Sequence, residues 1–271
     1  MTRTEEWIPE EIALDQPNVA RIYDYLLDGY HNFEIDRVMA DRVIQINPDF
    51  RLAAHVNRAF LRRCVRFLAE QGIDQFLEVG SGLPTAGHVH EIAQEINPAA
   101  RVVYVDIDPV AVAHSQAMLH GSSTATVIRA DARQPDQILD HAEFKRLLDL
   151  SRPAAVLFCA ILHLIPDDQE AYYAVSTLRD VLAPGSYVAV SHPSRDDAPP
   201  EMVDGLNKST ARASANYQFR RHAQIGRFFD GLELVEPGLV FTPLWRPEGP
   251  DDLLVDQPER AYCLAGIGYR P

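Results

Sequence analysis

The chain has 271 residues, of which 46% are hydrophobic, and it carries a formal net charge of −14. This size suits one large α/β domain with a helical appendage rather than two independent cores. Nucleic-acid binders normally present a basic surface, so the acidity argues against DNA or bulk RNA as a partner. The three cysteines are widely spaced among apolar residues, as is typical of buried thiols in a reducing compartment. The sequence has neither a membrane-length apolar run nor a signal-peptide core, so we expect a soluble cytoplasmic protein.

The N-terminal part is predicted to form an arm and a helical cap over residues 1–72. The arm is polar, and Asn18 after it is a suitable N-cap for a first helix whose apolar residues recur at helical spacing. A second helix is expected to end before Pro48, and a third is expected over residues 52–71. Residues 23–32 combine Tyr, His and Asn side chains with a helix break at a glycine, so we expect them to close over a ligand as a lid.

Residues 73–271 are predicted to form a single domain in which short apolar strands alternate with helices. The first five expected strands are Gln75–Val79, Val102–Asp106, Thr126–Ala130, Ala155–Cys159 and Tyr187–Ser191. This alternation indicates βαβ units and a parallel sheet covered on both faces. Two further strands, Leu234–Phe241 and Ala261–Tyr269, have no long helix between them and are therefore expected to be antiparallel. A polar insert is expected at about residues 195–216.

The glycine-rich turn after the first expected strand is the strongest functional signal. Gly80, Ser81 and Gly82 join a strand to a helix, and glycines there permit a tight turn and close approach of a ligand to the backbone. Glu78 lies just before the turn, where a dinucleotide site is usually apolar because a carboxylate would face a pyrophosphate. The acid favours a ligand with a cationic group. The alternative is an ordinary strand–turn–helix corner with an incidental glutamate.

Acidic residues also follow the next two expected strands. Asp106 ends the second strand at the spacing where a carboxylate accepts the ribose hydroxyls of a nucleoside, and Ile107 beside it is a further candidate contact. Asp131 follows the third strand, where it can accept from an adenine amino group while the Ala132 amide meets the ring. A local turn is the alternative for Asp131. Asp108, which precedes a proline, is more typical of a helix start than of a ligand.

With acids after its first three strands, the segment 75–191 resembles the class I S-adenosylmethionine (SAM)-dependent methyltransferase domain. The wider sequence resembles an actinobacterial family of SAM methyltransferases, and the resembling stretches are residues 20–29, 57–63, 82–87 and 162–167. Pro84 departs from the usual turn, which has a third glycine there, although it fits the Gly-Leu-Pro-Thr-Ala-Gly run of this family. The resemblance implies a doubly wound, mostly parallel, Rossmann-like sheet of seven strands, in the order 3-2-1-4-5-7-6 with an antiparallel strand 7. It also implies SAM as the cofactor, but it supplies no acceptor.

Three residues are candidates for acting on a methyl acceptor. His163 follows the fourth strand, whose loop borders the methyl group in the fold that the resemblance implies, so it can act as a general base or orient the acceptor. A histidine that only caps the loop is an equal alternative. His192, after the fifth strand, is expected on the same rim of the sheet. Tyr23 can contact the ligand from the lid, or it can belong to the apolar face of its helix.

Three further residues complete the predicted cofactor site. Arg58 can bind the SAM carboxylate bidentately, although an exposed helical arginine is the commoner finding. Tyr25 can stack on the ligand or hydrogen-bond it from the lid, and Ala160 follows the fourth strand. No spacing of histidines, cysteines and acids is typical of a metal site.

The sequence therefore predicts a SAM-dependent enzyme that methylates a small molecule, with neither nucleic acid nor membrane as a partner. Acceptor, acceptor atom and oligomeric state stay open. One alternative is a SAM-binding protein without transfer activity. Another is a nicotinamide-dependent oxidoreductase, against which the acid at Glu78 and the helix-free terminal strand pair both count.

Overall fold

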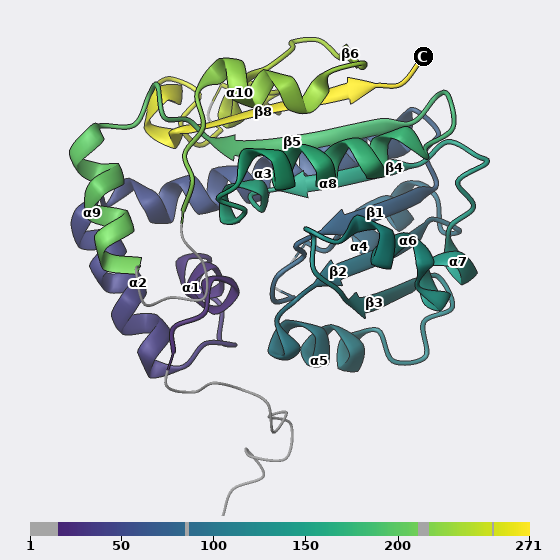
Figure 1. The fold of residues 1–271 in the computed structure, drawn as a ribbon, viewed down its shortest axis with the longest axis horizontal. Coiled ribbons are helices and arrows are strands. Elements are labelled where there is room, and N and C mark those ends of the chain that lie inside the picture. Colours follow the sequence, from purple (N-terminus) through teal and green to yellow (C-terminus); the bar gives the residue numbers. More distant parts are fainter. Residues whose placement is uncertain (1–15, 85–86, 211–216, 251) are drawn as a thin grey trace, which may run out of the picture.

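The computed structural model describes residues 16–84, 87–210, 217–250 and 252–271. Most of the predicted polar arm, the last part of the predicted insert (211–216) and two residues of the Gly-Leu-Pro-Thr-Ala-Gly run lie outside the described residues. A central sheet carries helices on both faces, and α1, α2 and α9 gather at one end of it (Figure 1). The arrowheads of the parallel strands point toward that end, so the carboxyl ends of these strands face the N-terminal helices.

Three helices precede the sheet, as predicted: α1 (Val19–Leu26), α2 (Glu34–Ile46) and α3 (Asp49–Glu70). The Asn18 side chain caps α1 by accepting a hydrogen bond from the Ala20 amide at 2.7 Å. The third helix begins at residue 49, three residues before the predicted start. Its C-terminal half packs on the sheet, so α3 belongs to the main core as well as to the N-terminal helices.

The sheet has the predicted order, with one more strand than predicted. Its strands are β1 (Gln75–Val79), β2 (Arg101–Asp106), β3 (Ala125–Arg129), β4 (Ala155–Cys159), β5 (Tyr187–Pro193), β6 (Glu233–Leu234), β7 (Val240–Phe241) and β8 (Cys263–Tyr269). They follow the order β3-β2-β1-β4-β5-β8-β6, and β7 also pairs with β8. The first five are parallel, and β8 runs antiparallel to β5, β6 and β7.

The predicted sixth strand, Leu234–Phe241, is wrong as a continuous element. It forms two short strands, β6 and β7, on either side of Pro237 and Gly238. Proline has no amide hydrogen to donate to a β-ladder, and Gly238 has a positive φ of 90° that a regular strand does not allow. The apolar pattern correctly indicated residues that pair with β8. It did not show that this pairing is interrupted between β6 and β7.

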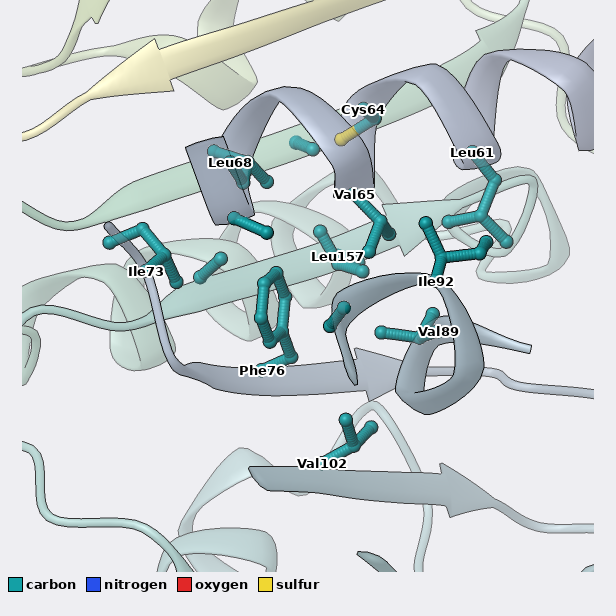
Figure 2. Close-up of a cluster of buried hydrophobic side chains, with 14 of the residues drawn as sticks. Leu61, Cys64, Val65, Leu68, Ile73, Phe76, Val89, Ile92, Val102 and Leu157 are labelled. Atoms are coloured by element: carbon teal, nitrogen blue, oxygen red, sulfur yellow. The ribbon is translucent and has the colours of Figure 1, made fainter. Parts of the chain in front are cut away.

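Helices cover both faces of the sheet. The remaining helices are α4 (Val89–Ile96), α5 (Pro109–Met118), α6 (Pro135–Asp140), α7 (Ala142–Leu147), α8 (Asp168–Asp180), α9 (Pro200–Thr210) and α10 (His222–Gly226). On one face, Phe76 of β1 is buried beneath side chains of α3 and α4, such as Leu68 and Val89 (Figure 2). On the other face, α6, α7, α8 and α10 pack against alternate strand residues, among them Leu77. Glu78 therefore points to the α3 face, because side chains two residues apart in a strand share a face.

Candidate functional site

A cavity of about 480 Å³ lies at the carboxyl ends of β1 to β4. The strand order reverses between β1 and β4, which is where open α/β sheets bind their ligands. Side chains from α1, α2, α3 and α9 close it from the N-terminal side. It brings together most of the residues predicted from the sequence: Tyr23, Arg58, Glu78, Gly80, Ser81, Gly82, Asp106, Ile107, Asp131, Ala132, Ala160 and His163.

The glycine turn is fixed between β2 and the loop after β4. The amides of Gly80 and Ser81 both donate to the carbonyl oxygen of Val105, at 2.8 and 3.0 Å. Gly80 and Gly82 have positive φ values of 73° and 65°, which suit glycine. A Cβ atom at Gly80 would lie 2.4 Å from the side chain of Ile161. The first glycine is therefore needed for packing, and the second leaves open space on the cavity side.

Asp106 is buried and holds the turn from the adjacent strand. One carboxylate oxygen accepts from the Gly82 amide at 2.7 Å, and the other accepts from the Asp108 amide at 2.9 Å. Burial raises the pKa of Asp106 to about 6, although these amides act in the opposite direction. Each oxygen keeps a second acceptor site, so the carboxylate can bind a pair of ligand hydroxyls in the cavity.

Glu78 is a buried acid at the bottom of the cavity. Burial raises its pKa to about 7, and the charge of Arg58 on α3 opposes that rise. No described residue donates a hydrogen bond to its carboxylate. A desolvated carboxylate of this kind is stabilised by a cationic ligand group. Arg58 also lines the cavity, and its guanidinium donates to the Gly87 carbonyl at 3.4 Å.

Asp131 lies at the mouth of the cavity together with an arginine that sequence reasoning missed. The Arg133 guanidinium donates to both Asp131 carboxylate oxygens, with Nε at 3.0 and 2.9 Å. Burial raises the pKa of Asp131, but the bonds to Arg133 outweigh burial and hold it below the usual value. The Asp-Ala-Arg spacing was the available signal for this pair. Ile107, also at the cavity, is 56% exposed and offers an apolar surface to a planar ligand.

A chain of hydrogen bonds connects the N-terminal helices to the loop after β4. The Tyr23 hydroxyl donates to the Ala54 carbonyl at 3.2 Å and accepts from Asn57 at 2.9 Å. Asn57 accepts from the Ser191 hydroxyl at 2.6 Å, and that hydroxyl accepts from the Ala160 amide at 2.9 Å. Burial raises the pKa of Tyr23 to about 12. Tyr23 therefore keeps its proton at neutral pH and serves this chain of contacts. Asn57 begins one of the stretches that resemble the family, but neither Asn57 nor Ser191 was predicted as a site residue.

Tyr25 does not line the cavity, contrary to its predicted place in the cofactor site. Its hydroxyl donates to Asp41 on α2 at 3.2 Å, and its ring lies 5.2 Å from the Arg51 guanidinium. Residues two apart on a helix point in different directions, so Tyr23 and Tyr25 cannot both face one ligand. The sequence pattern showed two tyrosines without showing which one faces inward.

His192 does not line the cavity either, contrary to its predicted place on the rim. Its ring is fully buried, with Nδ1 2.8 Å from the Pro193 carbonyl and Nε2 2.9 Å from Arg220. The arginine can only donate, so His192 is neutral, with the proton on Nδ1. Burial and the nearby charges lower its pKa well below the usual value. The His192 side chain therefore points toward the helices that cover the sheet and not toward the cavity.

Arg220 is the buried cation that organises this region, and nothing in the sequence marked it. It is fully buried and donates to Asp168 at 2.9 Å. It also donates to the carbonyls of Leu162 and Ile165, at 2.8 Å each. These contacts fix the ends of the short loop that carries His163.

His163 lines the cavity and is 9% exposed. Its ring stacks on Tyr217, with centroids 5.3 Å apart and planes 24° apart. Burial and the charge of Arg220 lower the pKa of His163 to about 3. Its Nδ1 atom has no hydrogen-bond partner among the described residues. At neutral pH, His163 is therefore an uncharged ring, in which one nitrogen donates and the other accepts a hydrogen bond.

Comparison with known families decides what kind of protein has this site. A family model described as S-adenosyl methyltransferase matches residues 5–271. The chain belongs to this methyltransferase family. The match confirms the resemblance predicted from the sequence, and SAM is the cofactor. In the described part of this methyltransferase, no cluster of His, Cys, Asp and Glu is arranged to hold a metal ion, and no helix is long and apolar enough to cross a membrane.

Two crystal structures share the fold of this methyltransferase over nearly the whole chain. A protein from Thermobifida fusca is 42% identical, with a TM-score of 0.90, and the match covers 98% of this chain and 99% of that one. A DUF574 family protein from Streptomyces avermitilis is 35% identical, with a TM-score of 0.89 and coverage of 95% and 98%. No curated protein sequence matches this methyltransferase.

Proposed function

We propose that this methyltransferase transfers the methyl group of SAM to a small molecule held inside the cavity. The observation that carries the proposal is that one cavity contains the acids at the carboxyl ends of β1 and β2 and after β3, together with an apolar part lined by the N-terminal helices. A concave site with an apolar lining suits a small acceptor. The net charge of −14 also favours a small molecule over nucleic acid. The free cysteines Cys64, Cys159 and Cys263 support a reducing compartment such as the cytoplasm.

The charged and glycine residues of the cavity suit the charged and polar groups of SAM. We assign Glu78 to the amino group, Arg58 to the carboxylate and Asp106 to the ribose hydroxyls. Asp131, Ala132 and Ile107 are assigned to the adenine, and Ser81, Ala160 and the turn glycines to backbone contacts along the cofactor. The buried acid at Glu78 and the open space at Gly82 are the features that a cationic, closely approaching ligand explains.

Catalysis then depends mainly on positioning. When bound, SAM supplies an electrophilic methyl group and leaves as S-adenosylhomocysteine. The residues of the protein hold the acceptor in line with the methyl group of SAM. This positioning can supply much of the rate enhancement. The contacts from Tyr23 through Asn57 and Ser191 to Ala160 couple α1 to the loop after β4. We propose that α1 acts as part of a cap over both ligands.

Glu78 provides the test of cofactor choice. Calorimetry is expected to show binding of SAM and S-adenosylhomocysteine but not of NAD(H), because a carboxylate at this position opposes a pyrophosphate and attracts an ammonium group. SAM affinity is expected to rise between about pH 5.5 and about pH 7.5. The sign follows because the free protein holds the pKa of Glu78 near 7, so binding a cation below that pH requires loss of a proton. The conservative change Glu78→Gln should weaken binding and flatten this profile. NAD(H) binding as tight as SAM binding would overturn the assignment.

Asp106 provides the test of the ribose contact. Asp106→Ala is expected to weaken S-adenosylhomocysteine binding by about 1–3 kcal/mol, because the ligand hydroxyls lose a charged acceptor. Asp106→Asn should recover little of this loss. Both carboxylate oxygens accept from backbone amides, so an NH₂ group in the place of either one meets another donor. Calorimetry measures the affinities, and thermal unfolding checks that each variant is folded. Parent-like affinity in a folded Asp106→Ala variant would remove Asp106 from the site.

A further inference from the structure

The part of the cavity beyond the cofactor residues is uncharged. The described charged residues of the lining are Arg58, Glu78, Asp106, Asp108, Asp131 and Arg133. Five of them lie at the carboxyl ends of β1 and β2 or in the loops after β2 and β3, and Arg58 contacts Gly87 beside the glycine turn. Apart from uncharged residues at the ends of β1 to β3, the remaining described lining comes from the N-terminal helices, the loop after β4, the end of β5, α9 and residues 217–219 and 261–263. It carries no formal charge once His163 is neutral.

The same region is rich in apolar and aromatic side chains. Ile22, Leu26 and Val43 contribute aliphatic surface, and Phe50, Tyr217 and Phe219 contribute rings. Aromatic side chains pack well against a planar ligand, edge-on or offset. Burying a charged acceptor here costs several kcal/mol, because no described side chain on this side can pair with it. These two properties favour an uncharged, largely apolar ring compound.

Of the polar side chains in this part of the lining, which include Asn57 and Tyr217, His163 is the one that can take up a proton from a reacting group. It is more than nine-tenths buried, and its Nδ1 atom has no partner among the described residues. Arg220 holds its loop through the carbonyls of Leu162 and Ile165. Nδ1 is enclosed by protein atoms, so Nε2 is the ring nitrogen left for a ligand. With the proton on Nδ1, Nε2 accepts a hydrogen bond and the ligand supplies the donor. An aliphatic amine would arrive as a cation, whereas a hydroxyl on an aromatic ring arrives neutral and is nucleophilic enough to react when its proton is partly withdrawn.

We propose, on the basis of the proposed function, that the acceptor is an uncharged aromatic compound whose ring hydroxyl donates to His163 and receives the methyl group. The hydroxyl oxygen forms a bond to the methyl carbon, and the methyl–sulfur bond breaks with its electron pair going to sulfur. The hydroxyl proton passes through the hydrogen bond to His163 and is released to solvent when the products leave. The products are an aryl methyl ether, S-adenosylhomocysteine and a proton.

The test uses the full chain saturated with S-adenosylhomocysteine and four matched probes: 2-naphthol, naphthalene, 2-naphthoate and 2-naphthylmethylammonium. Calorimetry or ligand fluorescence is expected to show 2-naphthol binding at least about tenfold tighter than either charged probe, and several-fold tighter than naphthalene. With SAM, 2-naphthol should yield its methyl ether. His163→Gln should reduce the preference for 2-naphthol over naphthalene, while His222→Gln, an exposed histidine outside the cavity, should leave it unchanged.

The outcomes separate this inference from the proposed function. If S-adenosylhomocysteine does not bind, the proposed function fails. If it binds but 2-naphthol does not, or a charged probe binds as tightly as 2-naphthol, the acceptor class is wrong and the cofactor site stands. Equal effects of His163→Gln and His222→Gln would likewise overturn the role of His163.

Discussion

Replacing Arg220 by methionine is expected to lower the free energy of unfolding by about 3–5 kcal/mol. The guanidinium is fully buried, and its loss leaves His192 and two loop carbonyls without this donor. Asp168 loses its ion pair and keeps only the hydrogen bond from Gln224. Buried polar groups that lose their partners pay their desolvation cost without compensation. Urea unfolding of the parent and the variant measures the difference, and the loop that carries His163 is expected to lose amide protection first.

The matched control for this prediction is Arg195→Met, which removes an exposed arginine two residues after the end of β5. That change is expected to alter stability by no more than about 0.5 kcal/mol. A loss below about 1 kcal/mol for Arg220→Met would mean that water reaches the stranded carbonyls. In that case Arg220 does not hold the loop, and the place of His163 must depend on its stacking with Tyr217.

Gly80→Ala and Gly82→Ala are expected to differ although both place a side chain at a positive φ. In each variant, backbone strain lowers the stability by about 1–2 kcal/mol. A Cβ at residue 80 additionally meets the Ile161 side chain at 2.4 Å, whereas a Cβ at residue 82 meets nothing within 4 Å. Gly80→Ala should therefore lose about 2–5 kcal/mol of stability, of which 1–3 kcal/mol comes from overpacking. Gly82→Ala should lose only the strain and should mainly weaken SAM binding.

A double-mutant cycle isolates the steric part of this effect. Ile161→Ala removes the two nearest atoms, Cγ1 and Cδ1, and leaves only Cβ at 2.8 Å. Gly80→Ala should therefore cost less in that background than in the parent, by about 1 kcal/mol. Gly82→Ala should cost the same in both backgrounds. Additive losses for Gly80→Ala and Ile161→Ala would show that the turn moves away from the loop after β4. The measurements are urea unfolding for stability and calorimetry for SAM affinity.

The core of the fold could be predicted from local patterns. The strands β1 and β4 begin and end at the predicted residues, and β2, β3 and β5 agree within two residues, because buried parallel strands are short apolar runs bounded by turns and helices. The first helix begins after Asn18, since an N-cap is a property of the few residues around it. The strand order came from the resemblance to known methyltransferases, and the structure confirms it. The sixth strand failed, because its interruption at Pro237 and Gly238 depends on pairing with a strand far along the chain.

What the sequence by itself determined is the nucleotide end of the site: the glycine turn and the acids after the first three strands. In a doubly wound sheet these residues meet at one edge because parallel strands end together, so their place in the chain is enough to place them in space. Only the tertiary structure decided the other end. It showed that Tyr23 lines the cavity and that Tyr25 does not. It also showed that His192 is buried and hydrogen-bonded to Arg220, so that of the two candidate histidines His163 alone lines the cavity. Those outcomes depend on helices packing against distant segments, and such contacts between residues far apart in the chain leave no periodic trace in the sequence.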